Sequence, residues 1–174
     1  MAYGVVRTDN MMGTDVSTYL DSVRYFTTTT TANDTPTAIE NGNVVKVGAL
    51  LDGERELHLA TAPAVNTPLK EIGLVATPEV MYDERKHNLD EFRNEAGANV
   101  RIYYLHDGDE FGITADCFTA AADVAVGDVV ELQASTKLKV VAAGTGATSG
   151  STVVGKIIAI ESTKRYTYYV VRVG

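Results

Sequence analysis

The sequence predicts a mostly-β protein, a small β-barrel or sandwich with an extended N-terminal arm and one charged excursion. Short apolar and β-branched runs are separated by turn-forming residues at intervals of roughly 8–12 residues, which is typical of sandwiches and barrels. The chain has 174 residues, 45% of them hydrophobic and 22% charged, so it is long enough to bury a core. No helical pattern of useful length separates consecutive strands, which argues against a parallel βαβ sheet.

Residues 1–37 are expected to form the arm, and residues 38–174 the β-rich domain. The arm has no clear hydrophobic period, although residues 15–23 fit a short turn or helix. Residues 27–31 are five consecutive threonines, whose β-branched side chains favour an extended backbone. Alone, such a segment buries too little apolar surface to offset its ordering entropy. We therefore expect it to lie on another surface, and we prefer a neighbouring chain over its own domain.

The first half of the domain is predicted to contain three strands. Asn41-Gly42 is a strong signal for a tight turn, because both residues tolerate a positive φ. Residues 54–59 alternate between polar and apolar side chains, which places His58 on a polar face. The strand-like runs of this half are residues 43–51, 54–59 and 70–76.

Residues 78–97 form the one strongly charged stretch and interrupt the pattern of strands. Met81, Leu89 and Phe92 fall near one helical face. Arg85 interrupts that face, so the helical pattern is weak. A short helix and an exposed loop both fit this inserted excursion.

From residue 100 onward, one strand-like run follows another, separated by turn formers such as Asp107-Gly108. The glycine-rich residues 144–150 are interpreted as a hairpin loop. They have no Gly-Lys-Ser or Gly-Lys-Thr ending, and no helix follows to hold a phosphate. The runs are residues 100–105, 111–118, 129–132, 137–141, 153–160 and 166–173.

The cysteine and histidine residues do not predict a reactive centre. Cys117 is the one cysteine, has no metal-ligand spacing around it and lies in an apolar run. We interpret it as a small buried hydrophobe and not as a nucleophile. His58, His87 and His106 are far apart in the sequence, and none has a second histidine or a cysteine at ligand spacing. We expect surface roles for all three.

An acidic cluster follows His106 and is a candidate cation site. Asp107, Asp109 and Glu110 contain an Asp-x-Asp pattern, but the longer ligand pattern of an EF-hand loop is missing. A turn flanked by acids explains the cluster equally well.

A cluster of tyrosines near the C-terminus is the best candidate for a nucleic-acid platform, since such platforms set aromatic rings among basic residues. Tyrosines on a terminal strand more often cover a core edge or a subunit contact. The cluster consists of Tyr166, Tyr168 and Tyr169 beside Lys164 and Arg165.

From the cysteine, the histidines, the acidic cluster and the tyrosines together, we predict no catalytic, cofactor-binding or metal-binding residue and no enzymatic activity.

The charge and the ends of the chain restrict the partners further. The formal net charge is −8, and the basic residues are scattered among more numerous acids, which argues against direct contact with nucleic acid. The first residues contain no apolar signal region, and no apolar run approaches the roughly 20 residues that span a bilayer. We expect a protein made in the cytoplasm that has no membrane partner.

Three segments of the second half resemble small β-barrel head proteins of tailed bacteriophages. In residues 126–132 a Gly-Asp turn opens a strand, residues 137–141 follow, and residues 153–160 form a Val-Gly-x-Ile strand after a loop. The middle segment, residues 74–97, is similar to structural proteins of phages from Gram-positive hosts. The resemblance covers roughly residues 40–174, and its motifs are short.

The resemblance implies a decoration protein located in the virion, on the outer capsid surface. Such a protein binds major capsid subunits, often as a homotrimer at local three-fold positions, and stabilises the shell by bridging neighbours. Residues 1–37 would supply an arm for this contact. The alternatives are a tail or connector component, a carbohydrate-binding module, which the absence of tryptophan disfavours, and a hydrolase that uses His106, Asp107 and Asp109.

Overall fold

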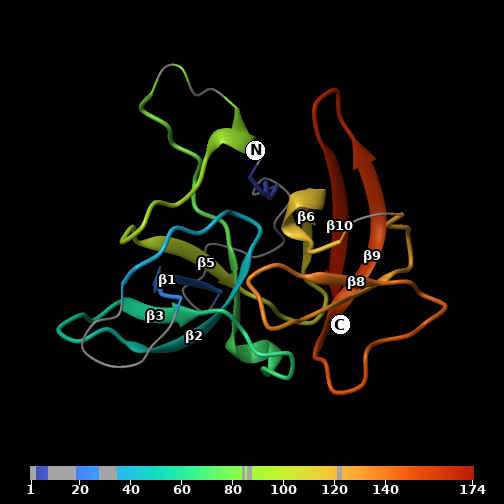
Figure 1. Ribbon diagram of the computed structural model, residues 1–174, viewed down its shortest axis with the longest axis horizontal. Helices are drawn as coiled ribbons and strands as arrows, with labels where there is room; N and C mark the ends of the chain where they lie inside the picture. Colours follow the sequence, from blue (N-terminus) through green and yellow to red (C-terminus); the bar gives the residue numbers. More distant parts are fainter. Residues whose placement is uncertain (1–2, 8–18, 28–34, 84, 86–87, 121–122) are drawn as a thin grey trace.

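The computed structural model confirms a mostly-β protein and describes residues 3–7, 19–27, 35–83, 85, 88–120 and 123–174 (Figure 1). Its described part contains ten strands and three single-turn 3-10 helices, and they form a closed barrel and a second, open sheet. The strands are β1 Leu20–Tyr25, β2 Val44–Leu50, β3 Leu57–Thr61, β4 Ile72–Val75, β5 Val100–Tyr104, β6 Glu110–Ile113, β7 Val129–Glu131, β8 Lys139–Val141, β9 Val153–Ser162 and β10 Thr167–Val173. The 3-10 helices are η2 Leu69–Glu71, η3 Leu89–Glu91 and η4 Ala115–Cys117.

Five strands close the barrel in the order β1-β3-β2-β4-β5, with β5 paired to β1. The pairing of β1 with β3 is parallel, whereas the other four are antiparallel. Closure gives every strand two neighbours, so the barrel has no free edge.

Neighbouring residues of a strand point to opposite sides, and where the barrel packs against the second sheet its wall is apolar on both faces. On the inner face, Val75 is paired with Ile102, and both belong to the barrel core. On the outer face, Leu74 lies between Val44 and Tyr103, and these three pack against the second sheet. This explains why β4 is buried along its whole length and shows no alternation.

The second sheet has the order β6-β10-β9-β7-β8 and is antiparallel throughout. Its inner face contributes Phe111, Ile113, Val130 and Val171 to the core that it shares with the outer wall of the barrel. The hairpin of β9 and β10 extends beyond the rest of this sheet as a two-stranded ribbon (Figure 1).

The described parts of the predicted arm belong to the chain's own domain, which corrects the expectation for residues 1–37. Strand β1, where a turn or helix fitted residues 15–23, is a full member of the barrel, and its Val23 is completely buried. Val5 and Val6 are buried, and Val6 bridges to Ile113 at the edge of β6. These apolar side chains offset the ordering entropy that the polar composition leaves uncompensated. Residues 8–18 and 28–34 lie outside the described residues.

In its described residues 78–83, 85 and 88–97, the charged excursion is a loop, and the expected short helix is limited to the single 3-10 turn η3. Its base is clamped by buried amides. Asn41 donates to the Thr77 carbonyl oxygen (2.8 Å) and accepts a hydrogen bond from Thr77 N (3.1 Å). Asn94 donates to the Ile39 carbonyl oxygen and to Asn41 Oδ1, both at 3.1 Å. The loop therefore leaves the domain from a fixed base.

Candidate functional site

Cys117 is buried at the junction of the two sheets, which confirms its interpretation as a small hydrophobe. Burial raises the pKa of its thiol to about 12, so the thiol stays protonated at neutral pH. Its sulfur contacts the carbonyl oxygens of Val5 and Asn41, at 3.8 Å each. The residue joins the N-terminal segment, the turn before β2 and η4.

The predicted turn at Asp107–Glu110 is present, and Asp109 and Glu110 interact with other groups of the protein itself. Asp109 accepts a hydrogen bond from His106 N at 2.9 Å, and Glu110 lies 3.9 Å from Arg172 across the sheet. Among the residues that the structure describes, no group of three or more His, Cys, Asp or Glu side chains is placed to hold a metal ion.

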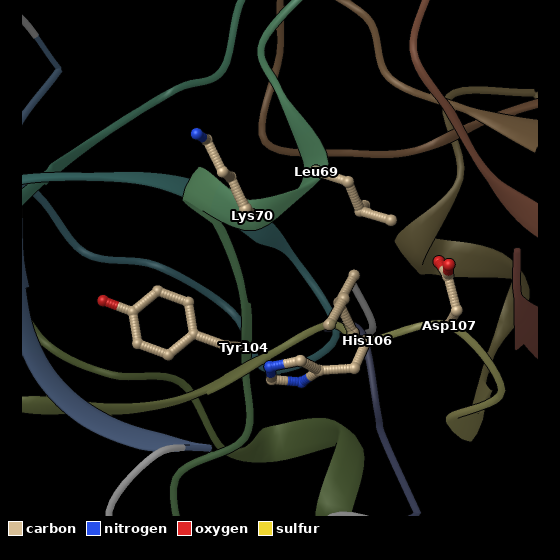
Figure 2. Close-up of a pocket in the computed structure, with 6 residues that line it drawn as sticks. Leu69, Lys70, Tyr104, His106 and Asp107 are labelled. Carbon is tan, nitrogen blue, oxygen red and sulfur yellow. The ribbon is translucent and has the colours of Figure 1, made fainter.

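A cavity of about 480 Å³ lies beside this turn, lined by Leu69, Lys70, Tyr104, Leu105, His106 and Asp107. Figure 2 shows that its polar groups diverge: Lys70 and Asp107 lie on opposite sides, and the Tyr104 hydroxyl points away from Asp107. Divergent groups do not orient one small ligand, which needs converging polar contacts.

The Tyr104 hydroxyl belongs instead to a polar chain at the mouth of the barrel. It donates to Asp21 at 3.0 Å, and burial together with this carboxylate raises its pKa to about 12. His58 Nε2 lies 3.5 Å from the same carboxylate, and its Nδ1 lies 3.0 Å from the Gly48 carbonyl oxygen. Thus His58 lies on the barrel side of β3 and not on the expected polar surface. These polar contacts link β1 to β2, β3 and β5.

The tyrosine cluster does not form an aromatic platform. Tyr168 is buried with Arg7 above its ring, and Tyr169 packs against the core. Tyr166 donates to Asp90 Oδ1 at 2.9 Å, and Arg165 pairs with the same oxygen at 3.1 Å. Arg165 and Tyr166, at the tip of the ribbon, are therefore bonded to the excursion. The interpretation that these tyrosines cover an edge of the core is closer to what the structure shows.

The glycine-rich residues 144–150 form a loop but not the predicted hairpin, because β7 lies between β8 and β9 in the sheet. A buried carboxylate holds this loop. Glu131 is fully buried and accepts hydrogen bonds from Lys139 Nζ at 2.7 Å and from Thr148 N at 2.8 Å. Burial by itself raises the pKa of Glu131, but the bonds from Lys139 and Thr148 outweigh it and lower the pKa below 4.5. The loop thereby covers the outer face of β7 and β8.

Exposed large apolar side chains occur at the two projecting elements, and also at Leu50, Val65 and Val126 elsewhere on the surface. Tyr82, in the excursion, is 94% exposed, and Val80 beside it is 58% exposed. On the ribbon, Ile158 and Ile160 are each 40% exposed. Figure 1 shows the excursion and the ribbon at the same end of the molecule. Since Asp90 bonds to both Arg165 and Tyr166, these two elements are held together.

Sequence reasoning missed the exposed isoleucines. The continuous apolar run at residues 153–160 is typical of a strand buried on both faces. However, β9 continues past the end of β7, so its second half has no covering neighbour. The lengths of the two apolar runs could have indicated this, because the run at residues 129–132 is only half as long as the run at residues 153–160.

Comparisons with known proteins do not assign a family. No protein-family model matches the chain, and neither a curated protein nor a solved structure matches it. No helix in the described part is both long and apolar enough to cross a membrane.

Proposed function

We propose that this protein is a structural component of a tailed-bacteriophage head, which binds the outer surface of the capsid and stabilises it by bridging major capsid subunits. It acts by binding and not by catalysis. The proposal rests on the resemblance of residues 126–132, 137–141 and 153–160 to phage head proteins. It also rests on the exposed side chains of Val80, Tyr82, Ile158 and Ile160 in the excursion and the ribbon, which lie at the same end of the molecule.

The second observation carries the proposal, because it points to a binding surface. An apolar aromatic side chain that is almost completely exposed, as Tyr82 is, gains free energy when a partner covers it. The buried amides at the base of the excursion hold the loop before binding, so less conformational entropy is lost. In a homotrimer at a local three-fold position, three such ends would act together, and avidity would exceed the affinity of one copy.

Cosedimentation with capsids tests this function. DNA-filled capsids of the virus that encodes the chain are stripped of this protein and mixed with the purified chain. We expect the wild-type chain to pellet with the capsids. Replacing both Val80 and Tyr82 with serine should weaken binding by about tenfold or more, as loss of a central contact does. The matched control is Val65→Ser, because Val65 is 42% exposed in a different loop and should bind as the wild type does.

Two results would overturn the proposal. If the wild-type chain stays in the supernatant, it is not a capsid-binding protein. If it assembles alone into tubes or rings, the tail or connector function replaces the head function.

A further inference from the structure

We propose that the open edge of β9 accepts an extended strand from the partner, so that the second sheet grows by one strand on binding. This inference rests on the proposed function for the identity of the partner, a capsid subunit. It adds the place and the mode of binding.

The edge is open over residues 158–162. β7 pairs with β9 only as far as Lys156, and the last backbone bonds to that side are Gly127 N to the Ile157 oxygen (2.7 Å) and Ile157 N to the Asp128 oxygen (2.9 Å). Beyond Ile157, no strand in the described part of the chain lies on this side of β9. The ribbon is therefore two-stranded there.

The hairpin geometry shows which backbone groups face this edge. Thr163 N donates to the Tyr166 oxygen at 2.8 Å, so residues 163 and 166 form a hydrogen-bonded pair. Along an antiparallel strand, hydrogen-bonded and non-bonded pairs alternate. Ser162 and Ile160, opposite Thr167 and Tyr169, are thus in non-bonded pairs, and their N–H and C=O groups point away from β10. A partner strand can bond to these four groups.

The side chains at this edge favour an apolar partner segment. Ile160 continues a row that begins with the buried Ile113 and crosses Tyr169. Ile158 is the extra residue of a β-bulge, between the pairs of Ile157 and Ala159. The free edge has no proline and no lysine, the residues that usually prevent strand addition.

The charges around the edge favour acidic residues in that segment. Lys156 before it and Lys164 after it are exposed, and neither forms an ion pair with any residue described here. The other basic residues of the ribbon are paired, Arg165 with Asp90 and Arg172 with Glu110. An apolar strand with an acidic residue near each end is complementary to this pattern.

A second copy of this chain does not fit as well. Antiparallel pairing of two β9 strands about Ile160 would place Lys164 of one copy opposite Lys156 of the other, and like charges opposite each other destabilise a strand pair. Five free residues are also far short of the roughly 1,200–2,000 Å² that specific interfaces bury. A capsid subunit that covers the edge and the neighbouring excursion together buries more surface.

The test uses three substitutions at Ile160 and the capsid cosedimentation assay. Ile160→Pro removes the outward N–H without removing a bond to β10, a position where strands tolerate proline. Ile160→Lys keeps the N–H but opposes an apolar partner, so it covers the case in which the proline variant fails to fold. Ile160→Val keeps both features and is the matched control. We expect both disruptive variants to bind about tenfold more weakly or worse, and Ile160→Val to bind as the wild type does.

Hydrogen exchange on the free and capsid-bound chain distinguishes strand addition from simple apolar contact. In the free chain, the amides of Ile160 and Ser162 should exchange faster than those of Ala159 and Glu161, which face β10. On the capsid, Ile160 and Ser162 should become protected. A double replacement of Lys156 and Lys164 with glutamate should weaken binding, while Lys137→Glu should not.

The outcomes separate the two proposals. If wild-type protein binds capsids but the Ile160 variants bind equally well, or the two amides stay unprotected in the complex, strand addition is wrong and the capsid function stands. If the amides become protected at high concentration of the chain alone, the occupant is a second copy, which also overturns this inference. If wild-type protein does not bind capsids, both proposals fail.

Discussion

The barrel and the second sheet share one core, yet their edges differ. In the barrel, closure through β1 and β5 gives every strand two neighbours. In the second sheet, one edge is covered by the chain itself, because Arg7 N donates to the Gly112 oxygen at 2.8 Å beside β6. Strand β9 lies inside this sheet, but it extends past the end of its neighbour β7 and leaves that part of its own edge open. Covered edges stabilise the fold, and an uncovered apolar edge is available for binding.

This difference also separates two kinds of residue. Residues at the junction of the sheets should contribute strongly to the free energy of unfolding. Residues on the open half of β9 should contribute little to it and should matter for binding. Substitutions in the two regions should therefore differ in their effects on the free energy of unfolding.

The largest effect is expected at the junction, for Gly42→Ala. Gly42 has φ = 79°, a conformation that side chains rarely adopt, and an added Cβ would overlap the sulfur of Cys117. Backbone strain and overpacking together should lower the free energy of unfolding by about 3 kcal/mol or more, measured by chemical denaturation. The control is Gly53→Ala, at φ = 78° with no heavy atom within 4 Å, which should cost about 1 kcal/mol. Equal costs for both would show that the junction is not tightly packed.

A smaller effect is expected where the glycine-rich loop is held against the second sheet. Lys139→Met leaves the buried Glu131 carboxylate without its cation and should destabilise the fold by about 2 kcal/mol. Lys137→Met, on the same strand segment without an ion pair to any described residue, should be nearly neutral.

The pH dependence follows from the lowered pKa of Glu131. This carboxylate contributes stability above its ordinary pKa of 4.5, and the contribution disappears as the pH falls through the lowered folded value. The stability difference between wild type and Glu131→Gln should therefore be full at pH 7 and shrink in acid. A difference that grows in acid would contradict the assignment.

The smallest effect is expected at the open edge. Ile160→Thr should change the free energy of unfolding by no more than about 0.5 kcal/mol, because the side chain is already partly in water. Ile157→Thr, three residues earlier on the same strand, buries a hydroxyl in the shared core and should cost about 2 kcal/mol or more. Similar values for the two would remove the distinction between the open and covered halves of β9.

Much of the secondary structure was predictable, because local sequence patterns indicate strands and turns. The runs at residues 43–51, 70–76, 100–105 and 153–160 each contain a strand, and Asn41-Gly42 does form a turn. Strand β1 was not predicted, because residues 20–25 contain two charged residues and only one fully buried side chain. Its place in the barrel depends on pairing with β3 and β5, which no local pattern reports.

The end of the molecule that carries the excursion and the ribbon was only partly predictable. The sequence indicated a charged excursion, but not that Tyr82 in it is exposed. It also indicated a tyrosine cluster, but not that Asp90, some 75 residues away, bonds to Arg165 and Tyr166. Contacts between residues so distant in sequence depend on the path of the whole chain.

Local sequence patterns specify a β protein with its turns, its buried cysteine and its lack of amphipathic helices, since hydrophobic period and turn chemistry act over a few residues. The arrangement of the whole chain in space specifies that five strands close a barrel, that residues 3–7 lie on the chain's own domain, and that half of β9 stays open. These features depend on which strands become neighbours and on where each neighbour ends. No short stretch of residues specifies either of these features.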